Sequence, residues 1–470
     1  MGQNLALNFA SHQIKCSVYN RSPDKVDQTV QRGEKEGCKD YVFGYKDLSA
    51  FIDSLVKPRK IIMMVTAGNA VDSSIEKISE YIDDGDILID GGNEWYENTQ
   101  RRAKAAADDG YHYIGMGVSG GEIGARYGPS LMPGGPSEVY NELKPLLSKI
   151  SAQVGDSSCV SYFIGAGSGN YVKMVHNGIE YADMQLISEA YDLLKLYGLT
   201  NEEMYKIFND WNQGELASYL IEITAKILIK EDKDVEGCEP KSGYLLDKIL
   251  DCTHNKGTGM WTVQAAASEQ VSVPTIADAL FMRYLSERKS DRVFASTILK
   301  GPTFDFKTIN KQQFIEDVKN ALYCSKICAY AQGFQLINQA AIKFKWEIDL
   351  KECARIWKGG CIIRAKLLDK IMLAYEKNSN LPLLLFDNNI TNDINIRQES
   401  WRRIVTLSIA SGYTVSGISA SLGYYDNYRR ARLPHNLLQA QRDYFGSHKF
   451  ERIDRNEGEF FHCKWTSEHA

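Results

Sequence analysis

The spacing of hydrophobic residues changes about a third of the way along the chain. Between residues 14 and 165, short apolar segments alternate with segments whose apolar side chains recur every three or four positions. Strands are predicted over residues 14–19, 60–65, 86–90, 112–117 and 160–164, with helices between them, for example over 71–82 and 137–150. This alternation is typical of βαβ units and predicts a mostly parallel, doubly wound sheet.

From Asn170 to about Tyr428 the apolar spacing is helical throughout, which predicts a large all-α domain. Residues 230–243 are polar and are expected to form a surface loop. The last residues are irregular but rich in aromatic side chains, so they are expected to pack against other protein. The predicted organisation is a Rossmann-like α/β domain over 1–166, a helical domain over 167–430 and a tail over 431–470.

Composition narrows the class of protein. The 470 residues carry 55 basic and 60 acidic side chains, and this balance argues against general affinity for nucleic acid or an anionic membrane. Ten cysteines occur without a C-x-x-C pair, which favours free thiols in a reducing compartment. The first residues do not resemble a targeting peptide and no apolar run reaches membrane-spanning length, so the cytoplasm is expected.

One helical segment combines several polar residues on a single face. Lys173, His176, Asn177 and Glu180 stand at positions i, i+3, i+4 and i+7, while Tyr181 follows directly. A solvent-exposed stripe of ion pairs is one interpretation of this spacing. The histidine, the asparagine and the glycine-rich run at 165–169 favour a reactive site instead, and the pattern alone leaves both open.

The residue types suit the oxidation of a β-hydroxy acid. A buried lysine has a lowered pKa, so Lys173 could accept the hydroxyl proton while a hydride leaves for a nicotinamide. The resulting ammonium could polarise the new ketone and allow carbon dioxide to leave. Glu180 could then protonate the enediol carbon. No metal-ligand spacing of His, Asp or Glu occurs nearby, which is consistent with a metal-free reaction.

Three short turns follow predicted strands, where doubly wound sheets bind their ligands. Two are glycine-rich, at 90–93 and 118–121, and either could equally be an ordinary tight turn. The third, Asn20-Arg21-Ser22, has an arginine where NAD-binding sheets usually place a carboxylate. Arg21 therefore favours NADP, although a solvated turn arginine would look the same.

Longer segments resemble the 6-phosphogluconate dehydrogenase family. The resemblance runs in order along essentially the whole chain. It includes Asp90-Gly-Gly-Asn-Glu, Val118-Ser-Gly-Gly-Glu-Ile-Gly-Ala-Arg-Tyr-Gly-Pro-Ser-Leu-Met-Pro-Gly-Gly, Val172-Lys-Met-Val-His-Asn-Gly-Ile-Glu-Tyr, Lys256-Gly-Thr-Gly, Trp357-Lys-Gly-Gly-Cys-Ile-Ile-Arg and Gln439-Ala-Gln-Arg-Asp-Tyr-Phe-Gly.

The resemblance implies a role for each matching position. Lys173 is implied as general base and Glu180 as general acid. The gluconate carboxylate and hydroxyls are implied to bind Asn93, Ser119, Gly120, Gly121, His176 and Asn177. The phosphate is implied to bind Tyr181, Lys256, Thr258 and Arg283. Arg442 and His448 are implied to reach the site of a second subunit in a homodimer. NADP is implied to contact Met1, Gly2, Asn20, Arg21, Ser22, Val65, Thr66, Ala67 and Asn93.

The chain also departs from the family pattern. Family members begin with a strand and a glycine-rich loop, of which Met1-Gly2-Gln3-Asn4 matches the end. The dinucleotide-binding sheet is therefore expected to lack its central first strand. Thr66 stands where the family has a lysine, and Asn170 stands where it has a histidine. Both departures are expected to weaken affinity rather than to remove activity.

Three functions are compatible with these observations. The first is a working NADP-dependent, decarboxylating 6-phosphogluconate dehydrogenase of the pentose phosphate pathway. The second is a catalytically impaired paralogue that dimerises and binds sugar phosphate but binds NADP poorly, which the shortened fingerprint motivates. The third is a related β-hydroxyacid dehydrogenase for an unphosphorylated acid, which would have no need of Lys256, Arg283 and Arg442 together.

Overall fold

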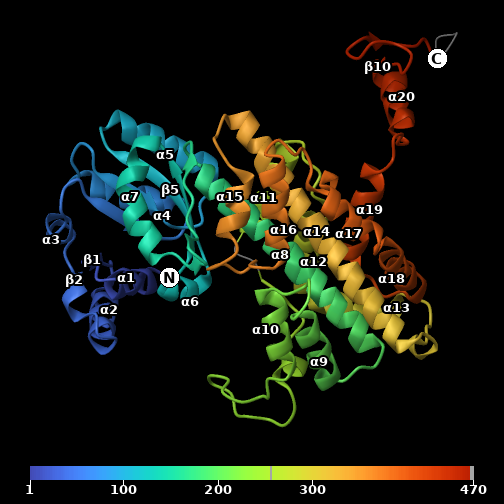
Figure 1. The fold of residues 1–470 in the computed structure, drawn as a ribbon, viewed down its shortest axis with the longest axis horizontal. Helices are drawn as coiled ribbons and strands as arrows, with labels where there is room; N and C mark the ends of the chain where they lie inside the picture. Colours follow the sequence, from blue (N-terminus) through green and yellow to red (C-terminus); the bar gives the residue numbers. More distant parts are fainter. Residues whose placement is uncertain (255–256, 466–470) are drawn as a thin grey trace. The chain divides into compact units, whose positions relative to one another are not determined.

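The computed structural model in Figure 1 describes residues 1–254 and 257–465. They form two compact units, the first over Met1–Ser421 and the second from Leu422 onward. The first unit holds the sheet and most of the helices. The second holds the C-terminal segment, and each unit is described by itself.

The main sheet has five strands in the order β3 (Lys60–Met63), β4 (Ile87–Asp90), β5 (His112–Ser119), β6 (Ser130–Gly135) and β9 (Phe163–Ile164). β3, β4 and β5 are parallel, β6 is antiparallel to β5, and β9 is parallel to β6. The predicted strand over 160–164 is shorter in the structure. β6 was not predicted, because Ser-Leu-Met-Pro-Gly-Gly shows no alternation of apolar and polar residues.

The strand predicted over residues 14–19 belongs to a separate sheet. β1 (Cys16–Tyr19) pairs in parallel with β2 (Val42–Tyr45), a short strand that the sequence did not reveal. Among the described residues, neither strand is hydrogen-bonded to the five-stranded sheet.

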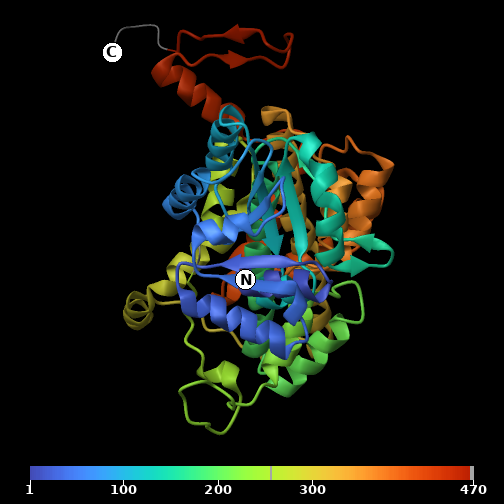
Figure 2. The same ribbon diagram turned by 90° about the vertical axis from the view of Figure 1, so that its left-hand side faces the viewer.

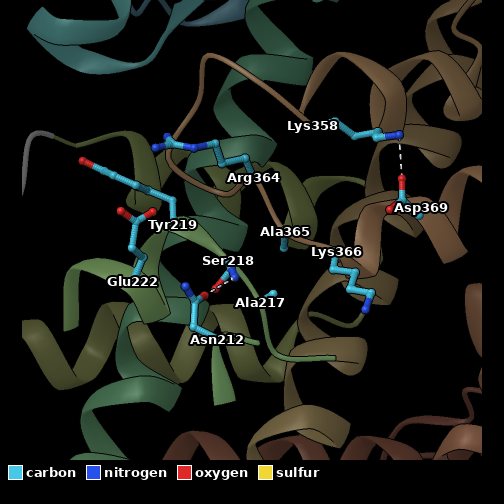
Figure 3. A pocket seen from close by; sticks show the side chains of 10 residues that line it. All are labelled: Asn212, Ala217, Ser218, Tyr219, Glu222, Lys358, Arg364, Ala365, Lys366 and Asp369. Atoms are coloured by element: carbon cyan, nitrogen blue, oxygen red, sulfur yellow. Dashed lines mark hydrogen bonds and ion pairs between the residues drawn. The ribbon is translucent and has the colours of Figure 1, made fainter. Parts of the chain in front are cut away.

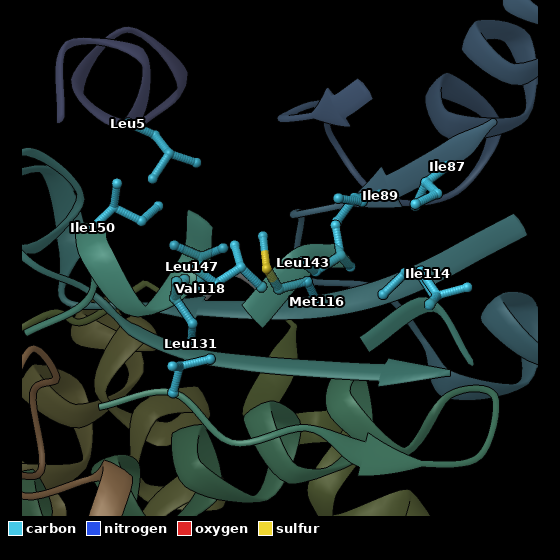
Figure 4. Packing of buried hydrophobic residues seen from close by; sticks show 12 residues of the cluster. Leu5, Ile87, Ile89, Ile114, Met116, Val118, Leu131, Leu143, Leu147 and Ile150 are labelled. Atoms are coloured by element: carbon cyan, nitrogen blue, oxygen red, sulfur yellow. The ribbon is translucent and has the colours of Figure 1, made fainter. Parts of the chain in front are cut away.

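Alternation along the strands buries both faces of the main sheet. Ile87 and Ile89 of β4 join a cluster with α1 (Gly2–Ser11) and α7 (Ser137–Ile150), shown in Figure 4. Leu88, between them, joins the opposite cluster with α3 (Leu48–Asp53), α4 (Asn69–Ser79) and α5 (Tyr96–Asp108). Successive side chains of a strand point to opposite faces, so both faces are covered. The predicted doubly wound α/β fold is confirmed.

Two long helices organise the rest of the first unit. α8 (Ser168–Leu196) packs along α14 (Lys311–Phe344), as Figure 1 shows. Around them and the sheets lie α2 (Pro23–Lys35), α6 (Gly121–Tyr127), α9 (Asn201–Trp211), α10 (Tyr219–Leu228), α11 (Thr258–Ser268), α12 (Pro274–Glu287), α13 (Lys289–Ile298), α15 (Leu350–Ile356), α16 (Leu367–Lys377), α17 (Asn388–Asn395), α18 (Gln398–Ser411) and the start of α19 (Ser416–Tyr428).

The helical pattern read from the sequence is therefore confirmed. Residues 230–243 follow α10 without regular helix or strand, as expected for a loop. In the parts of the chain that the structure describes, no helix combines the length and apolarity needed to cross a membrane.

The second unit is a small module. α20 (His435–Gly446) precedes a hairpin of β10 (Phe450–Glu451) and β11 (Phe460–Phe461), which Figure 2 shows beside the helix. Its side chains are mostly exposed, so it has little apolar core of its own.

A buried ion pair joins the two long helices. Lys326 of α14 donates to Asp183 of α8 at 2.5 Å, and both side chains are almost completely buried. Charges removed from water are tolerated only when they are paired, and loss of one partner leaves the other uncompensated.

Replacing Lys326 should therefore destabilise the fold. Lys326→Met is expected to lower the free energy of unfolding by about 3–5 kcal/mol, because Asp183 loses its counter-ion. Lys319→Met is the matched control on the same helix, since the Lys319–Glu316 pair at 3.6 Å is partly exposed. It should cost less than about 1 kcal/mol. Urea unfolding followed by circular dichroism measures both, and equal losses would contradict the account.

Candidate active site

The site begins where α8 meets the sheet. The helix starts after Gly167, whose φ of +84° favours glycine. A Cβ on Gly169 would lie 2.2 Å from the Met132 carbonyl oxygen, and one on Gly117 would lie 2.4 Å from Cβ of Lys173. Only glycine fits at such separations. The first turns of α8 therefore lie directly on β5 and β6, and Lys173 passes over Gly117.

Hydrogen bonds hold the amino group of Lys173 where α8 contacts the sheet. Its Nζ donates to Oγ of Ser119, at the end of β5, at 3.1 Å and to Oδ1 of Asn177 at 2.8 Å. Burial lowers the pKa of Lys173, whereas the nearby Glu180 and Cys361 act in the opposite direction. The structure therefore favours the neutral amine more strongly than water does.

His176 completes a hydrogen-bonded network with the same partners. It is fully buried, its Nε2 lies 3.2 Å from Oγ of Ser119, and its Nδ1 lies 3.0 Å from Oδ1 of Asn177. Burial and the neighbouring Lys173 lower the pKa of His176 well below its usual value. A neutral ring with its proton on Nδ1 satisfies every donor, because Ser119 can then donate to Nε2.

Glu180 stands one turn further along α8, at the edge of this network. Its side chain is 23% exposed and lies 3.9 Å from Nδ1 of His176. Burial raises the pKa of Glu180, Lys173 and Arg283 oppose this, and Asp183 adds to it. Burial thus favours the neutral form of Lys173 and of Glu180, which suits one as a proton acceptor and the other as a proton donor.

A second cluster lies beside Glu180 and combines α8, α11 and α12. The guanidinium carbon of Arg283 lies 3.5 Å from the ring centre of Tyr181. Thr258, at the start of α11, accepts from Nδ2 of Asn177 at 3.2 Å. A Cβ on Gly259 would lie 2.5 Å from the Tyr181 ring, so α11 packs tightly there. Lys256, the fourth predicted phosphate ligand, lies outside the described residues.

The turn after β5 closes another side of the site. Gly120 and Gly121 have φ values of +112° and +63°, and a Cβ on Gly120 would lie 2.5 Å from the carbonyl oxygen of Gly360. The segment that contains Gly360 also contributes Trp357, whose ring packs edge-on against His176 at 5.6 Å. Asn93 is exposed in the turn after β4.

The segment 357–364 belongs to the stretches that resemble the family, but its residues have no role implied by that resemblance. Burial raises the pKa of Cys361 to about 12, whereas the nearby Lys173 acts in the opposite direction. Its thiol donates to the Trp357 carbonyl oxygen at 3.0 Å. No local pattern could have found this contact, because nearly two hundred residues separate Cys361 from Lys173.

The predicted cofactor residues occupy three loops at strand or helix ends. A Cβ on Gly2, at the start of α1, would lie 3.3 Å from Cβ of Met64, so Met1 and Gly2 border the loop that holds Val65, Thr66 and Ala67. The loop after β4 approaches this loop closely at Gly92. A Cβ on Gly92 would lie 2.9 Å from the Val65 carbonyl oxygen.

The third loop lies between β1 and α2. Asn20 accepts from the backbone N–H of Ser22 at 2.9 Å, which leaves Arg21 exposed in the turn. The turn thus offers one cation and no carboxylate. These residues fit a dinucleotide that carries an extra phosphate on its ribose.

The two departures from the family pattern have different surroundings. Thr66 is exposed in the loop after β3. Asn170 is buried, and its Oδ1 accepts from Oγ1 of Thr99 at 3.0 Å. It therefore supports the contact between α8 and α5 rather than the surface around Lys173.

Arg442 and His448 belong to the second unit. A separate pocket, shown in Figure 3, lies between the start of α10 and the segment before α16, and no predicted site residue lines it. Within this pocket, the guanidinium carbon of Arg364 lies 3.7 Å from the ring centre of Tyr219. Nζ of Lys358 forms an ion pair with Oδ1 of Asp369 at 2.5 Å.

Comparison with known proteins identifies relatives for the whole chain. The model of the NAD binding domain of 6-phosphogluconate dehydrogenase matches residues 1–165, and that of the C-terminal domain of the same family matches residues 169–465. The decarboxylating 6-phosphogluconate dehydrogenase 2 of Arabidopsis thaliana is 54% identical over 99% of this chain and 95% of its own length. The Synechocystis enzyme is 48% identical over the same shares.

A solved structure agrees with these matches. The 6-phosphogluconate dehydrogenase of Plasmodium falciparum superposes with a TM-score of 0.94 at 46% identity. The match covers 99% of this chain and 98% of that one. That enzyme was solved in its apo form, with its cofactor NADP+ and with its substrate 6-phosphogluconate.

Proposed function

Because this chain belongs to the 6-phosphogluconate dehydrogenase family, we propose that it oxidises 6-phospho-D-gluconate with NADP+ and releases carbon dioxide and D-ribulose 5-phosphate. The observation that carries the proposal is the pair formed by Lys173 and Glu180 on one face of α8. Burial lowers the pKa of the first and raises the pKa of the second. One therefore suits a base and the other an acid for the two proton transfers of this reaction.

In the first step Lys173 acts on the C3 hydroxyl of the substrate. The neutral Nζ takes the hydroxyl proton, and C3 becomes a ketone as its hydride leaves. NADP+, when bound, supplies the nicotinamide that accepts this hydride. Ser119 and Asn177 hold Nζ in place through their hydrogen bonds.

In the second step the same residue acts as a cation. The Lys173 ammonium donates to the C3 ketone, so the electrons of the C1–C2 bond flow toward that oxygen as C1 leaves as carbon dioxide. The oxygen takes the proton from Nζ, which gives an enediol. Glu180 then protonates C2 while Lys173 recovers the proton from the C3 oxygen. The product is the 2-ketose.

Further residues hold the two ends of the substrate. We assign the carboxylate and hydroxyls to Asn93, Ser119, Gly120, Gly121, His176 and Asn177. We assign the phosphate to Tyr181, Lys256, Thr258 and Arg283. The stacking of Arg283 on Tyr181 supports this assignment, because it holds a guanidinium next to the residue that follows Glu180, the proposed acid.

The cofactor loops are assigned in the same way. Arg21 would pair with the 2′-phosphate, between Asn20 and Ser22, and Met1, Gly2, Val65, Thr66, Ala67 and Asn93 would line the rest of the dinucleotide. Residues 1–166 would thus bind NADP, 167–430 would bind substrate and 431–470 would reach a second subunit. The free thiols of the chain support a reducing compartment, for which we propose the cytoplasm.

An exposed apolar surface on α12 and α13 supports a homodimer. Phe281, Leu285, Val293, Phe294 and Ile298 are all exposed there. A patch of this kind is typical of a protein interface. In such a dimer, Arg442 and His448 of each chain would complete the phosphate site of the other.

Replacing one residue of this surface should weaken the dimer. Phe294 is 66% exposed, so Phe294→Asp is expected to leave the fold intact while a charge opposes burial in the interface. Sedimentation velocity should then detect monomer at micromolar concentration. Phe386→Asp, at an exposed phenylalanine outside the patch, is the control and should remain dimeric. A stable dimer in both variants would place the interface elsewhere.

Loss of the base should abolish oxidation. Lys173→Met is expected to reduce NADPH formation by on the order of 10³-fold or more, because within residues 1–254 and 257–465 no other lysine donates a hydrogen bond to Ser119. Lys195→Met, at the exposed end of the same helix, should retain wild-type turnover. Absorbance at the NADPH band measures both. Substantial NADPH formation by Lys173→Met would remove Lys173 from the mechanism.

The pH profile should depend on both groups. Lys173 must lose its proton to react, so kcat/KM rises with pH through a pKa that burial holds below the ordinary lysine value. Glu180 must keep its proton, so kcat/KM falls through a pKa that burial holds above the ordinary carboxyl value. The pair titrates together and gives a bell-shaped profile. Glu180→Gln should lose the falling limb, and an unchanged bell would exclude Glu180 as the acid.

A further inference from the structure

Asp443 occupies an unusual position in the second unit. Among the described residues after Tyr424 it is the one whose side chain is buried, with no measurable exposure. A carboxylate in place of an apolar core is costly unless N–H groups satisfy it. The centre of this module is therefore a charge, and its partners define the shape of the module.

Four donors converge on this carboxylate, two on each oxygen. Oδ1 accepts from the backbone N–H of Lys449 at 2.8 Å and from Nδ1 of His462 at 2.9 Å. Oδ2 accepts from the backbone N–H of Cys463 at 3.1 Å and from Nε1 of Trp465 at 2.8 Å. Asp443 thus ties α20 to the turn that follows it and to the segment after β11.

The same contacts fix the two residues that we assign to a phosphate. Arg442 precedes Asp443 and donates to Oε1 of Gln439 at 3.1 Å, and Gln439 donates to the Lys449 carbonyl oxygen at 2.5 Å. His448 precedes Lys449, whose N–H is held by Asp443. Arg442 and His448 are therefore the sequence neighbours of Asp443 and Lys449, the two residues that this hydrogen bond joins.

The backbone around His448 adds a second, independent observation. Ser447 and Lys449 have φ values of +51° and +58°, a conformation that residues with a Cβ seldom adopt. Such strain persists only where surrounding contacts hold it. The Asp443–Lys449 bond holds this turn together with two others, from the Ser447 N–H to the Asp443 carbonyl oxygen and from Gln439 to the Lys449 carbonyl oxygen. The carboxylate of Asp443 therefore contributes to the placement of His448.

The hydrogen-bond partners of Asp443 hold its carboxyl group in the charged form. Burial by itself raises a carboxyl pKa, but His462, Trp465 and the two backbone N–H groups together lower the pKa of Asp443. Each oxygen of the carboxylate accepts two of these hydrogen bonds. Arg442 and His448, in contrast, are both exposed and free to meet a phosphate.

We propose that Asp443 is a positioning residue for substrate phosphate, because it presents Arg442 and His448 at a fixed separation. It touches no substrate itself. This inference rests on the proposed function, in which these two residues complete the phosphate site of a second subunit.

The test compares four variants of the full chain in steady-state kinetics. Asp443→Asn keeps the size of the side chain but replaces acceptors by an amide, so the KM for 6-phosphogluconate should rise about tenfold with little change in kcat. The KM for NADP+ should not change. Trp465→Phe removes one donor and should raise the same KM by a smaller factor. Asp454→Asn is the control, because its pair with Arg452 is exposed in the same module.

The variant Arg442→Ala distinguishes the positioning role of Asp443 from the role of the tail in phosphate binding. It should raise the KM for 6-phosphogluconate by at least as much as Asp443→Asn does. If Arg442→Ala raises this KM and Asp443→Asn and Trp465→Phe do not, the positioning role is wrong and the proposed function stands. If Arg442→Ala leaves it unchanged, the tail has no role in phosphate binding. An equal loss of kcat and of NADP+ affinity in Asp443→Asn would show a general structural role and would also overturn the inference.

Discussion

The close contact between α8 and the strands β5 and β6 determines the chemistry of the site. Glycines on both sides of this contact, Gly117 and Gly169 among them, leave no room for side chains. Lys173 is therefore pressed against the sheet and buried. Burial is the largest influence on the pKa of Lys173. The close packing of the helix backbone on the strands therefore lowers the pKa of the amino group at the end of this side chain.

The same burial acts in opposite directions on the two groups of one helix face. It destabilises the charge of Lys173 and the charge of Glu180, which lowers one pKa and raises the other. Seven residues along an α-helix separate them by about two turns, close enough for one substrate to meet both. The rest of the helix is anchored by the buried Lys326–Asp183 pair, so the face cannot rotate without breaking an ion pair.

The spacing of apolar and polar residues along the chain predicted the strands and helices in which that spacing is regular. The strands that alternate between two buried faces and the long helix with Lys173, His176 and Glu180 were found in this way. β2 and β6 were missed, since β2 is a short strand and the sequence of β6 shows no alternation of apolar and polar residues. Trp357, Gly360 and Cys361 reach the site across a large sequence separation, and the role of Asp443 depends on donors that lie up to 22 residues away. Resemblance to a family supplied the roles that periodicity could not.

The central claim is that one site oxidises and decarboxylates the same molecule. The most direct test supplies 6-phosphogluconate labelled with ¹³C at C1 to the wild-type chain with NADP+. The account predicts labelled carbon dioxide and NADPH in equal amounts, with unlabelled D-ribulose 5-phosphate as the third product. NADPH without labelled carbon dioxide would show oxidation alone, and binding of 6-phosphogluconate without either product would show a protein that has kept the site but lost the reaction.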